Sequence, residues 1–90
     1  MLTLESRVWL ASGTRLQHDT VRQRWVLLGP ERLLVLDDMA RLILERIGDQ
    51  TIGALCKSLA GEFDAPLDTI QADVLALFAS MSERGFLRHA

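Results

Sequence analysis

The sequence predicts an α+β domain in which a three-stranded antiparallel sheet precedes a three-helix bundle, as in a winged helix-turn-helix. Its 90 residues are enough for one compact domain and too few for two. Hydrophobic residues make up 49% and charged residues 24%, which is the composition of a folded protein. Near residue 36 the apolar pattern changes from short extended runs to stripes at helical spacing. We therefore expect a single domain over residues 1–90.

The first part of the chain predicts three strands. Ser12–Asp19 alternates loosely between apolar and polar residues, which is typical of a half-exposed strand. Arg24–Leu28 is rich in β-formers and ends at Gly29-Pro30, because proline cannot donate to a strand ladder. Arg32–Leu36 follows directly, so the short connections favour an antiparallel meander.

Three helices are predicted to follow. Asp37 can cap the first, which Gly48 would end, and Thr51 can cap the second. Pro66 suits the first turn of the third helix, which would run to Gly85. We expect their apolar stripes to form the core, namely Met39, Ala40, Ile43, Leu44 and Ile47, then Ile52, Leu55, Cys56, Leu59 and Phe63, and then Leu67, Ile70, Val74, Leu77, Phe78 and Met81.

The sequence lacks the side chains that catalysis or metal binding requires. Cys56 is the only cysteine and lies within an apolar stripe, while His18 and His89 are far apart, so we expect no metal site and no cofactor. Asp37 and Asp38 are explained by helix capping. We therefore expect a protein that is not an enzyme. No apolar run reaches membrane-spanning length, and a cytoplasmic location is expected.

Charge argues against DNA binding, which remains an alternative for a winged helix-turn-helix. The net charge is −2, and residues 65–83 contain no Lys or Arg. Asp68, Asp73 and Glu83 would instead present negative charge on the third helix, where phosphate would lie. Residues 1–36 carry five arginines against three acidic residues, so the basic charge lies on the predicted sheet.

Apolar residues on both faces of the predicted sheet indicate a further contact. Trp25–Leu28 and Leu33–Leu36 are apolar at consecutive positions, whereas three helices in so small a chain cover one face. Three explanations remain open at this point: Val8, Trp9 and Leu10 pack over the sheet, the protein forms a homodimer there, or the surface binds a peptide. In a meander the third strand is an edge, which can accept another strand.

The string Trp25-Val26-Leu27-Leu28-Gly29-Pro30-Glu31, followed by Leu36-Asp37 and the helix containing Ala40, Ile43 and Leu44, resembles the pyrroloquinoline quinone biosynthesis protein D (PqqD) family. The resemblance covers roughly residues 13–88. Its other elements are Gly13-Thr14-Arg15-Leu16, Thr51-Ile52, Ile70, Asp73-Val74, Leu77-Phe78 and Gly85-Phe86-Leu87.

The resemblance implies a peptide chaperone of pyrroloquinoline quinone (PQQ) biosynthesis, a recognition element for ribosomally made and modified (RiPP) peptides. Such a chaperone would bind the precursor peptide PqqA and present it to the radical S-adenosylmethionine enzyme PqqE. The alternative client is the precursor of another peptide pathway. By family analogy the peptide adds to the third strand and lies along the third helix, which implies contacts at Arg32, Leu33, Leu34, Val35, Leu36, Asp73, Val74, Leu77 and Phe78. Leu34→Pro is then expected to weaken binding.

Two terminal segments complete the expectations. Phe86 and Leu87 are expected to fold back onto the core. Arg7–Leu10 lacks the proline that is frequent in the family at this point, so Trp9 could pack on its own domain, swap onto a neighbour or touch the enzyme. Of these, packing on its own domain is favoured, because a lone tryptophan is more often core than anchor.

Overall fold

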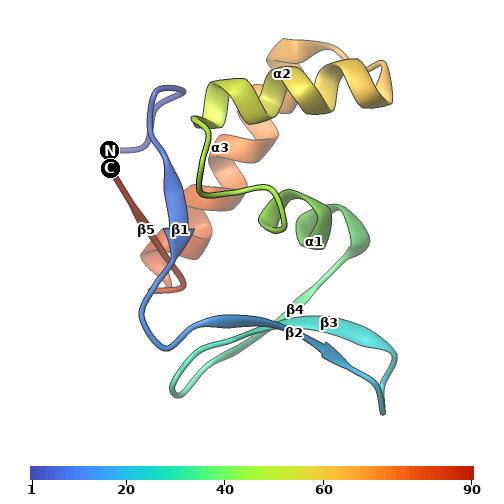
Figure 1. Cartoon of the computed structure of the whole chain (residues 1–90), viewed down its shortest axis with the longest axis vertical. Coiled ribbons are helices and arrows are strands. Elements are labelled where there is room, and N and C mark those ends of the chain that lie inside the picture. The colour runs from blue at the N-terminus through green and yellow to red at the C-terminus, as the bar shows by residue number, and fades with distance from the viewer.

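The chain folds with all three helices on one side of a three-stranded sheet (Figure 1). The computed structural model describes residues 1–90. Its elements are β1 (Val8–Leu10), β2 (Arg15–Asp19), β3 (Arg24–Leu28), β4 (Leu33–Leu36), α1 (Asp38–Leu44), α2 (Ile52–Phe63), α3 (Leu67–Glu83) and β5 (Leu87–His89). The predicted meander and three helices are confirmed, although the fold is like a winged helix only loosely. None of the helices is both long and apolar enough to cross a membrane.

Short turns fix the register of the β2–β3–β4 sheet. After β2, the Asp19 carboxylate accepts hydrogen bonds from the backbone N–H groups of Val21 and Arg22, at 3.1 and 3.2 Å. Between β3 and β4, the N–H of Gly29 donates to the carbonyl of Arg32 at 2.9 Å and closes a two-residue turn. Leu27 of β3 consequently lies opposite both Leu16 of β2 and Leu34 of β4, on the face that meets the helices.

The predicted caps of α1 and α2 are confirmed, and the end of α1 is corrected. Asp37 accepts a hydrogen bond from the N–H of Ala40 at 2.7 Å, and Thr51 accepts one from Ala54 at 3.1 Å. Gly48 was expected to end α1, but the helix ends at Leu44. The N–H of Arg46 instead bonds the carbonyl three residues back, which tightens the chain out of the α-helix.

Helix α3 begins one residue later than predicted and ends as expected. Pro66 lies immediately before the helix, with ψ at 129°, and is not within its first turn. The helix ends at Glu83, and Gly85 takes a φ of +82° that favours glycine. Its buried residues are Val74, Phe78 and Met81.

Three residues predicted to be core are exposed. Met39 and Phe63 each keep 46% of their surface exposed, and Leu67 keeps 36%. All three lie at the ends of helices: Met39 is the second residue of α1, Phe63 is the last of α2, and Leu67 is the first of α3. At these ends no neighbouring element covers the apolar stripe, so helical spacing alone predicted the wrong burial.

A second, two-stranded sheet was not predicted. Strands β1 and β5 pair antiparallel, with Val8 opposite His89 and Leu10 opposite Leu87, and they bring the two termini together (Figure 1). Phe86 and Leu87 are 3% and 4% exposed, which confirms that they fold back onto the core. The prediction that Trp9 packs on its own domain is wrong, because it lies at an outward position of β1 and is 39% exposed.

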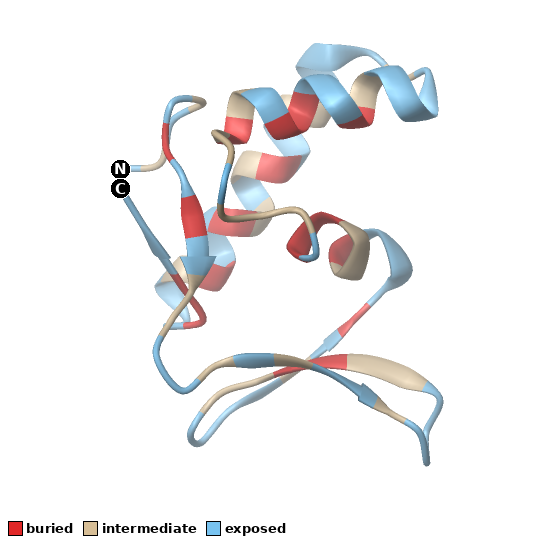
Figure 2. Ribbon diagram, viewed as in Figure 1, coloured by how far each residue is buried: buried red, intermediate tan, exposed pale blue.

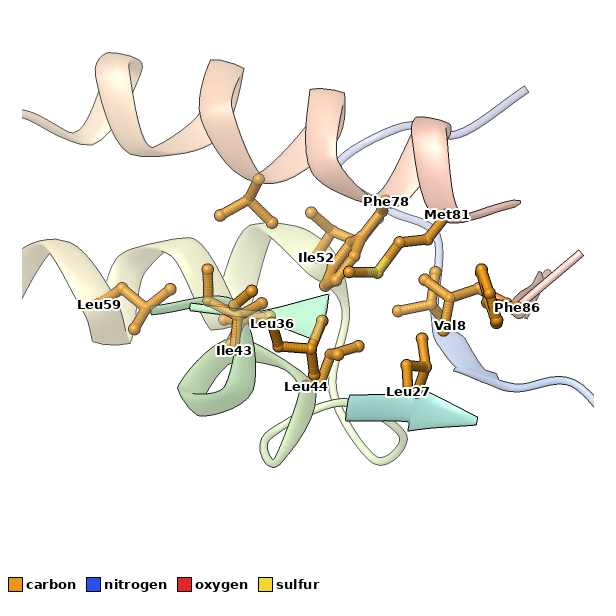
Figure 3. Close-up of a cluster of buried hydrophobic side chains, with 14 of the residues drawn as sticks. Val8, Leu27, Leu36, Ile43, Leu44, Ile52, Leu59, Phe78, Met81 and Phe86 are labelled. Atoms are coloured by element: carbon orange, nitrogen blue, oxygen red, sulfur yellow. The ribbon is translucent and has the colours of Figure 1, made fainter. Parts of the chain in front are cut away.

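The core fills the space between the helices and one face of the sheet (Figures 2 and 3). Leu27 of β3 and Phe78 of α3 have no exposed surface, and Ile52 of α2 is 1% exposed. The core cluster is made of Val8, Leu27, Leu36, Ala40, Ile43, Leu44, Ile52, Leu55, Cys56, Leu59, Val74, Phe78, Met81, Phe86 and Leu87. Val26 is also buried, at 3% exposed, but it does not belong to this cluster, because its side chain is on the opposite face of the sheet.

Two phenylalanines offer a matched test of this core. We expect Phe78→Ala to lower the free energy of unfolding by about 3–5 kcal/mol, because it leaves a cavity at a fully buried position. Phe63→Ala should change it by less than about 1 kcal/mol, because that side chain is half exposed. Urea unfolding followed by circular dichroism measures both, and equal losses would contradict the assignment of Phe78 to the core and Phe63 to the surface.

Candidate functional site

Strand β4 is an edge of the three-stranded sheet, since the strand order is β2-β3-β4. In an antiparallel pair, alternate residues exchange backbone hydrogen bonds and the residues between them point their N–H and C=O groups away. The bond from Gly29 to Arg32 fixes this alternation, so Leu34 and Leu36 bond to β3. The backbone groups of Leu33 and Val35 therefore point to the free edge, where they can pair with an added strand.

The side chains of β4 divide between the core and solvent. Leu36 is 7% exposed and belongs to the core, and Leu34 packs partly against it. Leu33 and Val35 are 51% and 49% exposed. Leu33 and Val35 therefore present exposed apolar side chains as well as the free backbone groups described above.

Arg32, predicted to contact a peptide, has a structural role through its side chain. Its guanidinium donates a hydrogen bond to the carbonyl of Arg84, at the end of α3. Terminal helix carbonyls lack partners within the helix, so a cation at this position stabilises them. The contact ties the β3–β4 turn to α3 and holds the start of the free edge in place.

An apolar pocket of about 240 Å³ lies where the three helices meet beyond the end of β4. Seven of its eight lining residues are hydrophobic. They are Met39 and Ile43 of α1, Leu59 and Phe63 of α2, Ala65 of the connecting turn, and Ile70, Asp73 and Val74 of α3. Its rim thus includes Met39 and Phe63, two of the residues that helical spacing assigned to the core.

A short stretch of chain connects the end of β4 to this pocket. Strand β4 ends at Leu36, the Asp37 cap starts α1, and Met39 follows in the first turn of that helix. On the far side, Asp64 takes a left-handed conformation with φ of 50°, which stops α2. The chain then turns sharply into α3, so Phe63 remains at the rim of the pocket.

The structure brings together some of the predicted contact residues and separates others. Asp73 and Val74, which were both predicted to contact the peptide, lie on α3 and line the pocket. Leu77 is half-buried and packs against the core, outside the pocket lining. Phe78 has no exposed surface, so its side chain supports the core and offers nothing to a peptide.

Sequence reasoning missed six of the pocket residues. Five of them had been assigned to the core stripes, namely Met39, Ile43, Leu59, Phe63 and Ile70, and Ala65 had no assignment. The available signal was their position, because all five lie within four residues of a helix end. An apolar stripe that extends to a helix end beside a short turn is a candidate for a groove as well as for a core.

Charge at the site is sparse and negative. Asp73 is the only charged residue that lines the pocket, and it is exposed. Beside the rim, Arg46 donates two hydrogen bonds to Glu62, at 2.5 and 3.0 Å, and joins the α1–α2 connection to the end of α2. These hydrogen bonds lower the pKa of the Glu62 carboxyl below its usual range.

Chemically reactive groups are far from this site or buried. Burial raises the pKa of the Cys56 thiol, which has no exposed surface. No three His, Cys, Asp or Glu side chains are grouped so that they could hold a metal ion. The arrangement of a free strand edge and an apolar pocket is suited to binding an extended chain.

Three other hollows lack the combination of a free edge and an apolar lining. The largest, of about 620 Å³, lies between the N-terminal residues and the outer side of α3, and none of its lining residues comes from the three-stranded sheet. The second lies at the β3–β4 turn, where Arg32 is already bonded to α3, and one of its nine lining residues is hydrophobic. The third lies between Gly13–Arg15 and Leu28–Gly29, away from β4, and one of its five lining residues is hydrophobic.

A family model and several curated proteins are similar to this chain over most of its length. The model of the family described as coenzyme PQQ synthesis protein D (PqqD) matches residues 24–87. A protein of Xanthomonas oryzae pv. oryzae named PqqA binding protein is 41% identical over 88 residues, which are 97% of this chain and 96% of that protein. A protein of the same name from Xanthomonas campestris pv. campestris is 42% identical over 80 residues, 88% of this chain and 87% of its own.

Two solved structures are similar. The solution structure of the PqqD part of Methylobacterium extorquens PqqCD, described as a functional, stand-alone RiPP recognition element, superposes with a TM-score of 0.84 at 32% identity. It covers 98% of this chain and 95% of that one. The crystal structure of PqqD from Xanthomonas campestris superposes with a TM-score of 0.61 at 41% identity, and covers 86% of this chain and 87% of its own.

The Arg46–Glu62 pair predicts a pH dependence. Because the pKa of Glu62 is lower in the folded chain, the pair stabilises the fold above the unfolded pKa, whose usual value is 4.5. That stabilisation is lost as the pH falls through the folded pKa. We expect Glu62→Gln to be less stable than the parent at pH 7 in thermal melts, and the difference to shrink below about pH 4. A difference that grew in acid would contradict this assignment.

Proposed function

This chain belongs to the coenzyme PQQ synthesis protein D (PqqD) family, and from that premise we propose that it binds the precursor peptide PqqA as an added strand. The observation that carries the proposal is a free β4 edge followed, three residues beyond its last residue, by Met39 in the lining of the apolar pocket. Relatives at 41% identity are named for binding PqqA, and a similar solved structure is described as a RiPP recognition element. Binding is therefore its role in PQQ biosynthesis.

The β4 edge supplies the sequence-independent part of the interaction. The backbone N–H and C=O groups of Leu33 and Val35 pair with the peptide backbone. Of the five residues from Arg32 to Leu36 that were predicted to contact the peptide through their backbone, only Leu33 and Val35 would then form hydrogen bonds with it. Leu34 and Leu36 direct their backbone groups to β3 and keep the edge straight.

The pocket supplies side-chain recognition. A strand laid along β4 and continued past Leu36 reaches the rim formed by Met39 and Phe63. An apolar side chain of the peptide enters between them and gains about 1.5–3 kcal/mol if fully buried. Asp73 at the same pocket favours a cationic or hydrogen-bond-donating neighbour in the peptide.

The role that fits these contacts is presentation of the peptide and no catalysis. Bound along an edge strand, PqqA is held in an extended conformation with one of its own edges free. We place the chemistry in the radical S-adenosylmethionine enzyme PqqE, which would receive the peptide in this form. The chain then acts in the cytoplasm, where the peptide is made.

Proline at Val35 tests the strand model. Val35→Pro removes a free N–H without breaking a bond to β3, so we expect PqqA affinity to fall about tenfold in a folded protein. Val35→Thr keeps the N–H and is the control, with a change of less than about twofold. Calorimetric titration with synthetic PqqA measures both.

The earlier candidate variant Leu34→Pro is unsuitable, because the N–H of Leu34 bonds to β3 and its loss disrupts the sheet itself. Equal PqqA affinities of Val35→Pro and the parent would contradict addition at β4.

A second variant tests the pocket. We expect Phe63→Ala to lower PqqA affinity about three- to tenfold, because it removes one wall of the pocket. Val21→Ala is the matched control, since Val21 is an apolar residue 86% exposed on the distant β2–β3 turn. The same calorimetric titration applies, and unchanged affinity of Phe63→Ala would place the peptide outside the pocket.

A further inference from the structure

The face of the three-stranded sheet that turns away from the helices carries apolar residues, and no helix packs on it. Its central residues are Val26 and Leu28 of β3 and Leu33 and Val35 of β4, which alternate with the core-facing residues of the same strands. None of the four belongs to the core or packs against it. Figures 1 and 2 show no helix on this side of the sheet. We call these four residues the outer face.

Polar residues of β2 flank the outer face. Gln17, Val26 and Val35 lie side by side in one row, and Arg15, Leu28 and Leu33 lie in the next. Val26 is only 3% exposed although no helix covers it, so the apolar surface open to a partner is that of Leu28, Leu33 and Val35. An accessible apolar strip of this kind is typical of a protein contact.

Charge around the outer face is basic. Arg15 is exposed at one end, and Arg24 lies at the other. The only acidic side chain on this side of the strands is Asp19, which faces Arg22 and Arg24 at 3.5 and 3.6 Å and is therefore already paired. An apolar partner surface with an acidic rim is complementary to this pattern. A second copy would instead set arginines against arginines.

A bound peptide would enlarge the same surface. A strand added to β4 extends the rows of the sheet, so alternate peptide side chains stand beside Leu33 and Val35 on the outer face. A protein that docks on the outer face then touches the peptide as well. The outer face is thus continuous with the peptide edge and does not compete with the pocket, which lies among the helices.

From these observations we infer that the outer face docks the enzyme that receives the peptide, through an apolar surface with an acidic rim on that enzyme. This inference rests on the proposed function. It assigns opposite sides of one small sheet to separate tasks: the helix side and the edge select the peptide, and the outer face binds the enzyme. Because the enzyme contacts sheet and peptide together, each ligand raises the affinity for the other.

Acidic substitutions on β2 test the inference away from the peptide edge. We expect Arg15→Glu to weaken binding of purified PqqE at least fivefold, because it reverses a rim charge. Gln17→Glu, in the row of Val26, should act in the same direction and serves as a second variant if Arg15→Glu fails to fold. Lys57→Glu on α2 is the control, with the same charge change at an exposed site elsewhere and an effect below twofold.

Biolayer interferometry with immobilised PqqE measures these affinities, with and without PqqA. In the parent chain, saturating PqqA should raise the affinity for PqqE at least threefold, while all three variants keep their PqqA affinity within twofold. PqqE affinities of Arg15→Glu and Gln17→Glu equal to that of the parent would overturn the inference. The inference would also be overturned if the parent chain bound PqqA but not PqqE, or if the parent chain self-associated and these variants did not. Neither of these two results would contradict the proposed binding of PqqA. Failure to bind PqqA would instead overturn the proposed function.

Discussion

One constraint shapes this molecule: its sheet contributes only one face to the core. Leu27 on that face has no exposed surface and belongs to the core cluster that also contains Phe78 of α3. In a chain of 90 residues, three short helices cover one side of a three-stranded sheet and leave the other side and both edges open. The surfaces assigned to peptide and enzyme are the parts of the sheet that this packing does not use.

Two contacts distant in sequence keep these surfaces in a fixed relation. The hydrogen bond from Arg32 to the carbonyl of Arg84 joins the β3–β4 turn to the end of α3. The β1–β5 sheet then returns the chain over the core, where Val8 and Leu87 are buried. Strand β4 and α3 are therefore held together at the turn end of the sheet, and the free edge keeps its position relative to the pocket.

The sequence predicted those features that depend on neighbouring residues and missed those that depend on distant ones. Asp37 and Thr51 were identified as caps because a cap bonds an N–H three residues away. Strand β4 was identified as an edge because short turns determine the order of a meander. The β1–β5 sheet was missed, since three-residue strands from opposite ends of the chain carry no local signal of pairing.

The site was predicted in part for the same reason. Its strand half followed from chain order and from the family resemblance, and the backbone alternation that selects Leu33 and Val35 needed the observed bond between Gly29 and Arg32. Its pocket half was predicted only at Asp73 and Val74, because periodicity gives the same pattern for an apolar residue in a core and in a groove. Met39 and Phe63 differ from true core residues only in where their helices end.

The energies of the two halves explain why the peptide site needs both. The free N–H and C=O groups of Leu33 and Val35 allow four backbone hydrogen bonds, each with a net gain of about 1 kcal/mol. A gain of about 4 kcal/mol corresponds to a dissociation constant of about 1 mM, before the cost of ordering a flexible peptide. Backbone pairing is also blind to sequence, so the edge alone would hold any extended chain weakly. Useful affinity and the choice of peptide must therefore come from the side chains that Met39, Phe63 and Asp73 receive.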